Sequence, residues 1–180
     1  RGCLEVKRRQ ITMEERQTTE QNIIEVDVAE VKIAQPLAKL VTRGLGSCLG
    51  ITIYDPIKKI GAMAHTMLPD IDKARIKSNP CRFTNSAIRK MVEDLEKLGS
   101  KREHLVAKLF GGAHMFSFID SDSVLNVGQK NAEVALTTLK ELGIKVKAQE
   151  TGGTFGRTIE LNLENGKVWI KTISLGEKEV

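Results

Sequence analysis

The sequence predicts an α+β fold in one domain. Two segments show the apolar period of amphipathic helices, and each of them ends at a glycine. Shorter apolar runs, found mainly before the first helix and after the second, are separated by turn residues and indicate strands. With 180 residues and 41% hydrophobic content, the chain can bury one substantial core. We expect residues 22–180 to form this domain.

Residues 1–21 are polar and charged, and they show no period. We expect a tail there, either disordered or added for expression, with Met13 as the candidate native start. The sequence has no run of roughly 18 apolar residues, and its first residues lack the apolar middle of a signal peptide. We therefore predict a cytoplasmic protein that does not insert into membranes.

The charge of the chain argues against binding to nucleic acid. The net charge is +5, but the first twelve residues contribute +3 of it, from Arg1, Lys7, Arg8 and Arg9 against Glu5. In the rest of the chain lysines and glutamates are interspersed, and aromatic residues, which would stack on bases, make up only 4% of the sequence. We expect no nucleic-acid partner.

Four strands are predicted before the first helix. The apolar residues between Ile24 and Ile33 alternate and then change phase, which indicates a strand with a bulge or a break. The other three strands are predicted at 38–42, 48–54 and 60–68. Asp55 and Pro56 are typical turn residues, so we expect the last two strands to pair antiparallel.

Helices and strands alternate in the second half. After a loop at 69–82, a helix is predicted to begin with a cap at Thr84 or Asn85 and to end at Gly99, and a second helix covers 127–142 before Gly143. Strands are predicted at 104–110 and 144–150. Asn165-Gly166, a pair typical of a type I′ turn, is expected to join the strands 158–163 and 168–173.

Cys48 has the setting of a reactive thiol. It lies on a turn between Gly46 and Gly50, at the start of a predicted strand. His65 lies about as far beyond the 55–58 turn as Cys48 lies before it, so an antiparallel pair would bring both to the same end of the sheet. A protonated histidine would lower the pKa of the thiol, and the pair would be suited to covalent catalysis.

Other interpretations of these residues remain open. Cys48 and His65 could be buried structural groups, since unpaired cysteines are among the most buried residues. A zinc site formed by Cys48, His65 and Cys81 would lack the close spacing of ordinary zinc ligands, so we predict no metal and no cofactor. We expect the remaining thiols and imidazoles to be structural or solvated: Cys3, Cys81, His104 and His114.

Five blocks of the sequence resemble one known family. In chain order they are GLGSCLGITIYDPIKKIGAMAHTMLP, RFTNSAIRKMVEDLEKLG, AKLFGGAHMF, NVGQKN and ETGGTFGRTIEL. Together they resemble the chemoreceptor glutamine deamidases of the CheD family over nearly all of residues 24–173. The resemblance implies a cysteine hydrolase with Cys48 as nucleophile, His65 as base and Thr42 as third member. It also implies a layered α/β/β sandwich of mixed sheets, similar to the cysteine hydrolases among bacterial deamidating toxins.

The resemblance also implies a reaction and partners. The substrates would be glutamine side chains of methyl-accepting chemotaxis receptors, and the protein would also bind a CheC-type phosphatase. Backbone N–H groups of Gly46, Ser47 and Cys48 are candidates to hold the oxyanion. Three glycine-rich turns are expected to meet at one end of the sheet, where the rim or partner contacts would be Gly111, Gly112, Phe116 and Arg157.

Two other functions share part of this pattern. The protein could be mainly a regulatory binding module for the phosphatase or the receptor, with little enzymatic activity. It could also be a thiol peptidase, which would use the same nucleophile and base but would cleave a backbone amide. Deamidation adds about 1 Da to the substrate, proteolysis creates new chain ends, and binding alone changes no mass.

Overall fold

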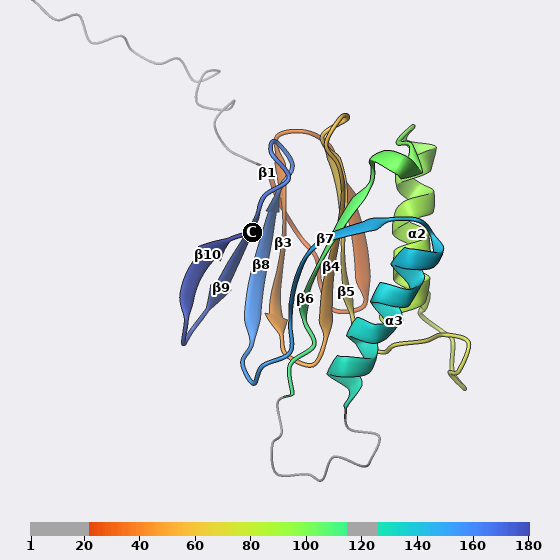
Figure 1. Ribbon diagram of the computed structural model, residues 1–180, viewed down its shortest axis with the longest axis vertical. Helices are drawn as coiled ribbons and strands as arrows, with labels where there is room; N and C mark the ends of the chain where they lie inside the picture. Colours follow the sequence, from red (N-terminus) through yellow and green to blue (C-terminus); the bar gives the residue numbers. More distant parts are fainter. Residues whose placement is uncertain (1–21, 115–125) are drawn as a thin grey trace, which may run out of the picture.

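Two β-sheets and two helices are stacked as three layers in the computed structural model, which describes residues 22–114 and 126–180 (Figure 1). Sheet A contains, in spatial order, β1 (Asn22–Glu25), β3 (Ala38–Leu45), β8 (Arg157–Asn162), β9 (Val168–Thr172) and β10 (Gly176–Glu179). Sheet B contains β2 (Glu30–Ala34), β5 (Ile60–Thr66), β4 (Leu49–Asp55), β6 (Val106–Gly111) and β7 (Lys145–Thr151). The predicted tail and Phe116 lie outside the described residues.

The helices α2 (Thr84–Lys97) and α3 (Val127–Glu141) cover the outer face of sheet B (Figure 1). Two short 3₁₀ helices, η1 (Pro80–Arg82) and η2 (Arg102–His104), precede α2 and β6. Each sheet is mixed, because β1 pairs in parallel with β3 and β6 pairs in parallel with β7, whereas the other pairs are antiparallel. The α+β prediction and its layered form are confirmed.

The central strands of sheet B are buried on both faces, and this explains their apolar sequence. Every residue of β4 and β5 is buried. One face packs on the helices, where Ile51 and Leu109 meet Met91. The other face packs on sheet A, where Met63 lies in the same cluster as Leu40. Strands covered on both sides need apolar residues at nearly every position.

The phase change that the sequence shows near residue 28 is a break between two sheets. β1 belongs to sheet A and β2 to sheet B, and Ala29 between them has a φ of 63°. The segment therefore crosses from one layer to the other, and the alternative of a bulge within one strand is excluded.

The predicted caps of the first helix make other contacts. The N-cap residue of α2 is Phe83, which makes no side-chain capping bond. Thr84 forms a hydrogen bond of 2.9 Å with the hydroxyl of Thr66, and the Asn85 side chain accepts from the N–H of Ile71. Both side chains therefore hold α2 against β5 and the following loop. The predicted stop at Gly99 is confirmed by its φ of 85°.

A strand boundary and a turn type need correction, and one strand was missed. β6 begins at Val106 because Arg102–His104 form a 3₁₀ turn. The type I′ turn is wrong: Gly166 has a φ of 71°, but Asn165 is not in the left-handed region, and the Gly166 N–H donates to Asn162 O across a longer loop. β10 was not predicted, because its sequence, GEKE, is charged and exposed. No helix within the described ranges is long and apolar enough to cross a membrane.

Candidate functional site

The turn that carries Cys48 connects the two sheets. β3 ends in sheet A at Leu45 and β4 begins in sheet B at Leu49, so the bend 46–48 spans the end of the sandwich. Thr42 and Leu45 are both fully buried because the register of β3 shifts between them, where Gly44 has a φ of 70°. Cys48 is half-buried and packs against the core between the sheets.

Cys48 and His65 lie at the same end of sheet B. In the antiparallel pair of β4 and β5, Gly50 is opposite His65 and Leu49 is opposite Thr66. The predicted pairing is therefore confirmed. Cys48 comes two positions before Gly50, and its contact with the core between the sheets places it on the same side of sheet B as His65.

Thr42 reaches His65 from the other sheet. Its Oγ1 lies 2.8 Å from Nδ1 of His65 and donates a hydrogen bond of 2.6 Å to the carbonyl oxygen of Val26. The threonine hydroxyl has only one proton, and a carbonyl oxygen can only accept. Nδ1 of His65 must therefore be the donor to Thr42. In the neutral imidazole this leaves Nε2 without a proton and able to accept one.

The second ring nitrogen of His65 is buried. Nε2 has no hydrogen-bond partner among the described residues, and the side chain is 1% exposed. Burial lowers the pKa of the His65 imidazole, and the charge of Asp27 opposes this effect. Burial also raises the pKa of the Cys48 thiol, and the backbone N–H of Cys48 opposes that effect. Both shifts favour the uncharged form of the group concerned, so burial does not favour the lowered thiol pKa that a protonated histidine would give.

Two carbonyl groups of the Cys48 turn accept hydrogen bonds from the turn that follows β6. The N–H of Gly112 donates to Cys48 O and the N–H of Ala113 donates to Gly46 O, both at 2.8 Å. A Cβ on Gly111 would overlap the Cys48 carbonyl oxygen, so only glycine permits this close approach. Gly111 and Gly112 are both buried. They support the turn from inside, and their role as rim or partner contacts stays a prediction.

Three turns meet at this end of the molecule. The 111–114 turn bonds to the Cys48 turn, and it also reaches the turn after β7, because Gly152 donates to Gly111 O at 2.9 Å and His114 donates to Gly153 O at 2.8 Å. The three turns lie together at the bottom of Figure 1, where β3, β6 and β7 end.

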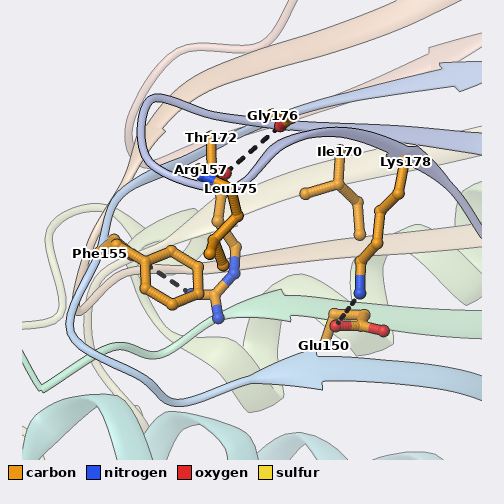
Figure 2. A pocket seen from close by; sticks show the side chains of 8 residues that line it. All are labelled: Glu150, Phe155, Arg157, Ile170, Thr172, Leu175, Gly176 and Lys178. Atoms are coloured by element: carbon orange, nitrogen blue, oxygen red, sulfur yellow. Dashed lines mark hydrogen bonds and ion pairs between the residues drawn. The ribbon is translucent and has the colours of Figure 1, made fainter.

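Arg157 lies beside the third turn. It is 6% exposed, its Nη2 donates to Gly152 O at 2.8 Å, and its guanidinium lies 4.3 Å from the centre of the Phe155 ring. It lines a cavity of about 280 Å³ at the open edge between β7 and β10, where Lys178 pairs with Glu150 at 2.8 Å (Figure 2). The cavity is therefore one place where a partner could contact Arg157.

Of the remaining thiol and imidazole groups of the described ranges, His114 lies in the 111–114 turn, and the other two lie in 3₁₀ helices. Cys81 is in η1, and His104 is in η2. Within residues 22–114 and 126–180, no group of three or more His, Cys, Asp or Glu side chains is placed to hold a metal ion.

Sequence reasoning missed Asn131. This asparagine in α3 is fully buried, and its Nδ2 donates to Ser47 O and to Met67 O, both at 3.2 Å. A signal was present: the asparagine shares one helix face with Ala135 and Leu139, where an apolar residue is expected.

If Cys48 and His65 act as nucleophile and base, removal of the Thr42 hydroxyl should lower kcat less than removal of the His65 ring. In Thr42→Val the shape is kept, but His65 loses the acceptor that selects its tautomer, and Val26 O loses its donor. We expect kcat to fall about 10-fold to 10²-fold, which is less than the roughly 10²–10⁴-fold that general acid–base catalysis contributes, because packing still holds the imidazole in part. Thr42→Ser keeps the hydroxyl and should recover most of the rate. Steady-state kinetics of both variants tests this, and a Thr42→Ser variant as slow as Thr42→Val would contradict it.

The pH dependence of alkylation should report the neutral state of Cys48. Because its pKa is raised, the thiolate fraction should grow as pH rises and should not level off below about pH 9. The measurement is the rate of Cys48 labelling by iodoacetamide between pH 5 and pH 10, a window chosen about the ordinary thiol value. A fast plateau below neutral pH that disappears in His65→Ala would instead indicate a thiolate–imidazolium pair.

Comparison with known proteins identifies the family. Residues 67–172 match the family described as CheD chemotactic sensory transduction. The chain is 42% identical over 157 residues to the probable chemoreceptor glutamine deamidase CheD of Clostridium novyi, covering 87% of this chain and 97% of that one. The protein of the same name from Clostridium botulinum is 43% identical over the same shares.

Solved structures are only distantly similar. Bacillus licheniformis YfiH matches with a TM-score of 0.45 and 15% identity over 69% of this chain and 51% of that one. A Neisseria meningitidis protein has the same TM-score and 11% identity, over 78% and 67% of the two chains. The sequence relatives and the family match, together with the blocks around Cys48 and His65, show that the chain belongs to the CheD family.

Proposed function

We propose that this protein is a cytoplasmic protein-glutamine deamidase that converts glutamine side chains of methyl-accepting chemotaxis receptors to glutamate, with Cys48 as nucleophile. The observation that carries the proposal is the hydrogen bonding of His65, whose Nδ1 must donate to Thr42 and whose Nε2 is left to accept a proton. The names of the relatives support the receptor as substrate and glutamine as the target.

In the first half of the reaction, Nε2 of His65 takes the proton of the Cys48 thiol as the sulfur attacks the carboxamide carbon of the glutamine. The carbonyl π bond opens, and its oxygen becomes an oxyanion. Gly46 N–H donates to Gly44 O, so we assign the oxyanion to the N–H groups of Ser47 and Cys48. When the carbon–nitrogen bond breaks, His65 gives its proton to the leaving nitrogen, and ammonia departs.

In the second half, a γ-glutamyl thioester on Cys48 is hydrolysed. His65 takes a proton from water, the water oxygen attacks the thioester carbon, and the thiolate leaves and recovers its proton from His65. The products are a glutamate side chain and the free enzyme. Thr42 is neutral, so it stabilises the imidazolium less than a carboxylate would, and we expect a modest turnover rate. The likeness to deamidating toxins that the sequence implies remains a prediction.

The test is incubation with the cytoplasmic fragment of a chemotaxis receptor, followed by peptide mass spectrometry. We expect about +1 Da at individual glutamines with release of ammonia, and no new chain ends. New termini would indicate a peptidase instead. A stable complex without any mass change would indicate the regulatory binding module.

A second role is docking of a CheC-type phosphatase at the same end of the sandwich. The cavity beside Arg157 supports this role, because it could receive a side chain of a partner close to the turn after β7. Phe116, the other predicted contact, lies outside the described residues. If the phosphatase and the receptor share this surface, added phosphatase should raise the apparent KM for the receptor and leave kcat unchanged. An unchanged KM at saturating phosphatase would contradict a shared surface.

A further inference from the structure

Asn131 is a polar residue on the buried face of α3. It is 0% exposed, and Ala135 and Leu139 on the same face are also fully buried. Its Oδ1 has no hydrogen-bond partner among the described residues. Asparagine has a lower helix propensity than leucine or alanine, and a buried amide without full hydrogen bonding lowers stability. An apolar residue would pack better at this position. The presence of asparagine there is explained by the hydrogen bonds that its Nδ2 donates.

Nδ2 of Asn131 bonds to two chain segments of the active site. Its acceptors, at 3.2 Å each, are Ser47 O in the Cys48 turn and Met67 O just after β5, the strand of His65. Both acceptors are carbonyl oxygens, so the amide must present its nitrogen to them, because a flipped amide would bring three oxygens together. Asn131 therefore links the segment before β4 to the segment after β5.

The bond to Ser47 O also determines the direction of the Cys48 N–H. These two groups belong to the same peptide unit, and the described residues contain no cis peptide bond. In a planar trans peptide, C=O and N–H point in opposite directions. α3 packs on the outer face of sheet B, whereas Cys48 packs on the inner face. A carbonyl held toward α3 therefore directs the Cys48 N–H toward the inner face, where His65 lies.

The preceding peptide unit is held in the same way. The N–H of Ala113 donates to Gly46 O at 2.8 Å, and the N–H in that unit belongs to Ser47. Two successive N–H groups are thus oriented by bonds to the carbonyls behind them. One of these bonds comes from a backbone group, and the other depends on the Asn131 side chain.

We propose that Asn131 is a positioning residue of the oxyanion site. It does not touch the substrate, and it acts by holding the Ser47–Cys48 peptide so that the Cys48 N–H faces the oxyanion formed from the glutamine carbonyl. The inference rests on the deamidase function proposed above. It assigns a catalytic consequence to a side chain from the helix layer, outside the three residues of the predicted triad.

The test compares Asn131→Leu with Thr138→Val. Leucine fills the site without a donor, and Thr138 is a matched control because it is a buried polar residue on the same helix, at 3% exposure, away from the Cys48 turn. We expect Asn131→Leu to lower kcat by about 10-fold to 10²-fold, somewhat less than complete removal of an oxyanion donor, with little change in KM. Thr138→Val should keep the wild-type kcat.

Alkylation separates the oxyanion effect from damage to the nucleophile. Iodoacetamide reacts with the thiolate at a saturated carbon and forms no oxyanion. At an alkaline pH where Cys48 is fully ionised, Asn131→Leu should therefore be labelled at the wild-type rate while its deamidation is slow. Each protein is checked by circular dichroism before the assay.

Three results would overturn the inference. The first is a wild-type kcat for Asn131→Leu, and the second is an equal loss in alkylation and deamidation. The third is an equal loss of kcat in Thr138→Val, which would assign the effect to helix packing. If the wild-type protein itself produced no deamidation, the proposed function would fail and this inference with it. If the wild-type protein deamidates the receptor and Asn131→Leu does so at the same rate, the inference is rejected and the proposed function stands.

Discussion

Cys48→Ala and His65→Ala should each abolish measurable deamidation while leaving the fold intact. Each change removes a whole chemical role, the nucleophile or the base, and groups of this kind carry factors of about 10⁴–10⁶ in the triads of serine proteases. Cys48 is only half-buried, so its loss leaves a small defect in the core. The measurement is the rate of +1 Da formation in receptor peptides, together with a thermal melt of each variant.

The two variants also control for each other. His65→Ala keeps the thiol, so Cys48 should still be alkylated at high pH although deamidation is lost. Cys48→Ala should lose both reactions at this position. Turnover at the wild-type rate by either variant would contradict the mechanism.

Gly111→Ala should disturb both stability and activity more than Gly143→Ala. Both glycines have positive φ, 95° and 71°, so alanine introduces backbone strain of about 1–2 kcal/mol at either position. Only at Gly111 would the new Cβ overlap the Cys48 carbonyl oxygen, whereas nothing lies within 4 Å at Gly143. We expect Gly111→Ala to lower the free energy of unfolding by about 2–4 kcal/mol, the sum of strain and overpacking.

The effect on activity should separate the two glycines further. Displacement of the Cys48 carbonyl moves the peptide units that are proposed to bind the oxyanion, so Gly111→Ala should lose most of its kcat. Gly143 ends α3 far from this turn in the chain, and its variant should retain the wild-type kcat. Urea denaturation and steady-state kinetics measure both quantities. Equal effects of the two substitutions would show that the turn tolerates a side chain behind Cys48.

Local signals predicted the parts of the fold that depend on neighbouring residues. The turn at Asp55 holds β4 and β5 in register, since its Oδ1 accepts from the N–H groups of Ile57 and Lys58, and this pairing was visible in the sequence. The ends of both helices at Gly99 and Gly143 were also predicted, because a positive φ at the end of a helix favours glycine.

Other features depend on contacts that are distant in the sequence. The crossing between β1 and β2 occurs at Ala29, where no glycine or proline marks it. β10 is an exposed edge strand that is held by pairing with β9, and its charged residues show no apolar alternation. Thr84 and Asn85 have the composition of helix caps, but tertiary partners in β5 and the next loop compete for their side chains.

The candidate site, like the fold, could be predicted from the sequence only in part. The proximity of Cys48 to His65 followed from counting residues about one turn, and Thr42 followed from the family resemblance alone. The effect of burial on the pKa of the two groups was not predicted, because burial between two sheets is a property of the assembled fold. Asn131 was missed because its acceptors, Ser47 O and Met67 O, are backbone groups far away in the sequence.

The central claim, that the glutamine acyl group passes through a thioester on Cys48, is tested most directly by product analysis in the presence of hydroxylamine. Hydroxylamine attacks thioesters, so the account predicts that part of the receptor glutamine becomes a γ-glutamyl hydroxamate, about +16 Da, at the expense of glutamate, about +1 Da. The hydroxamate should increase with hydroxylamine concentration and be absent with Cys48→Ala. Glutamate as the only product at every hydroxylamine concentration, formed equally well by Cys48→Ala, would contradict the account.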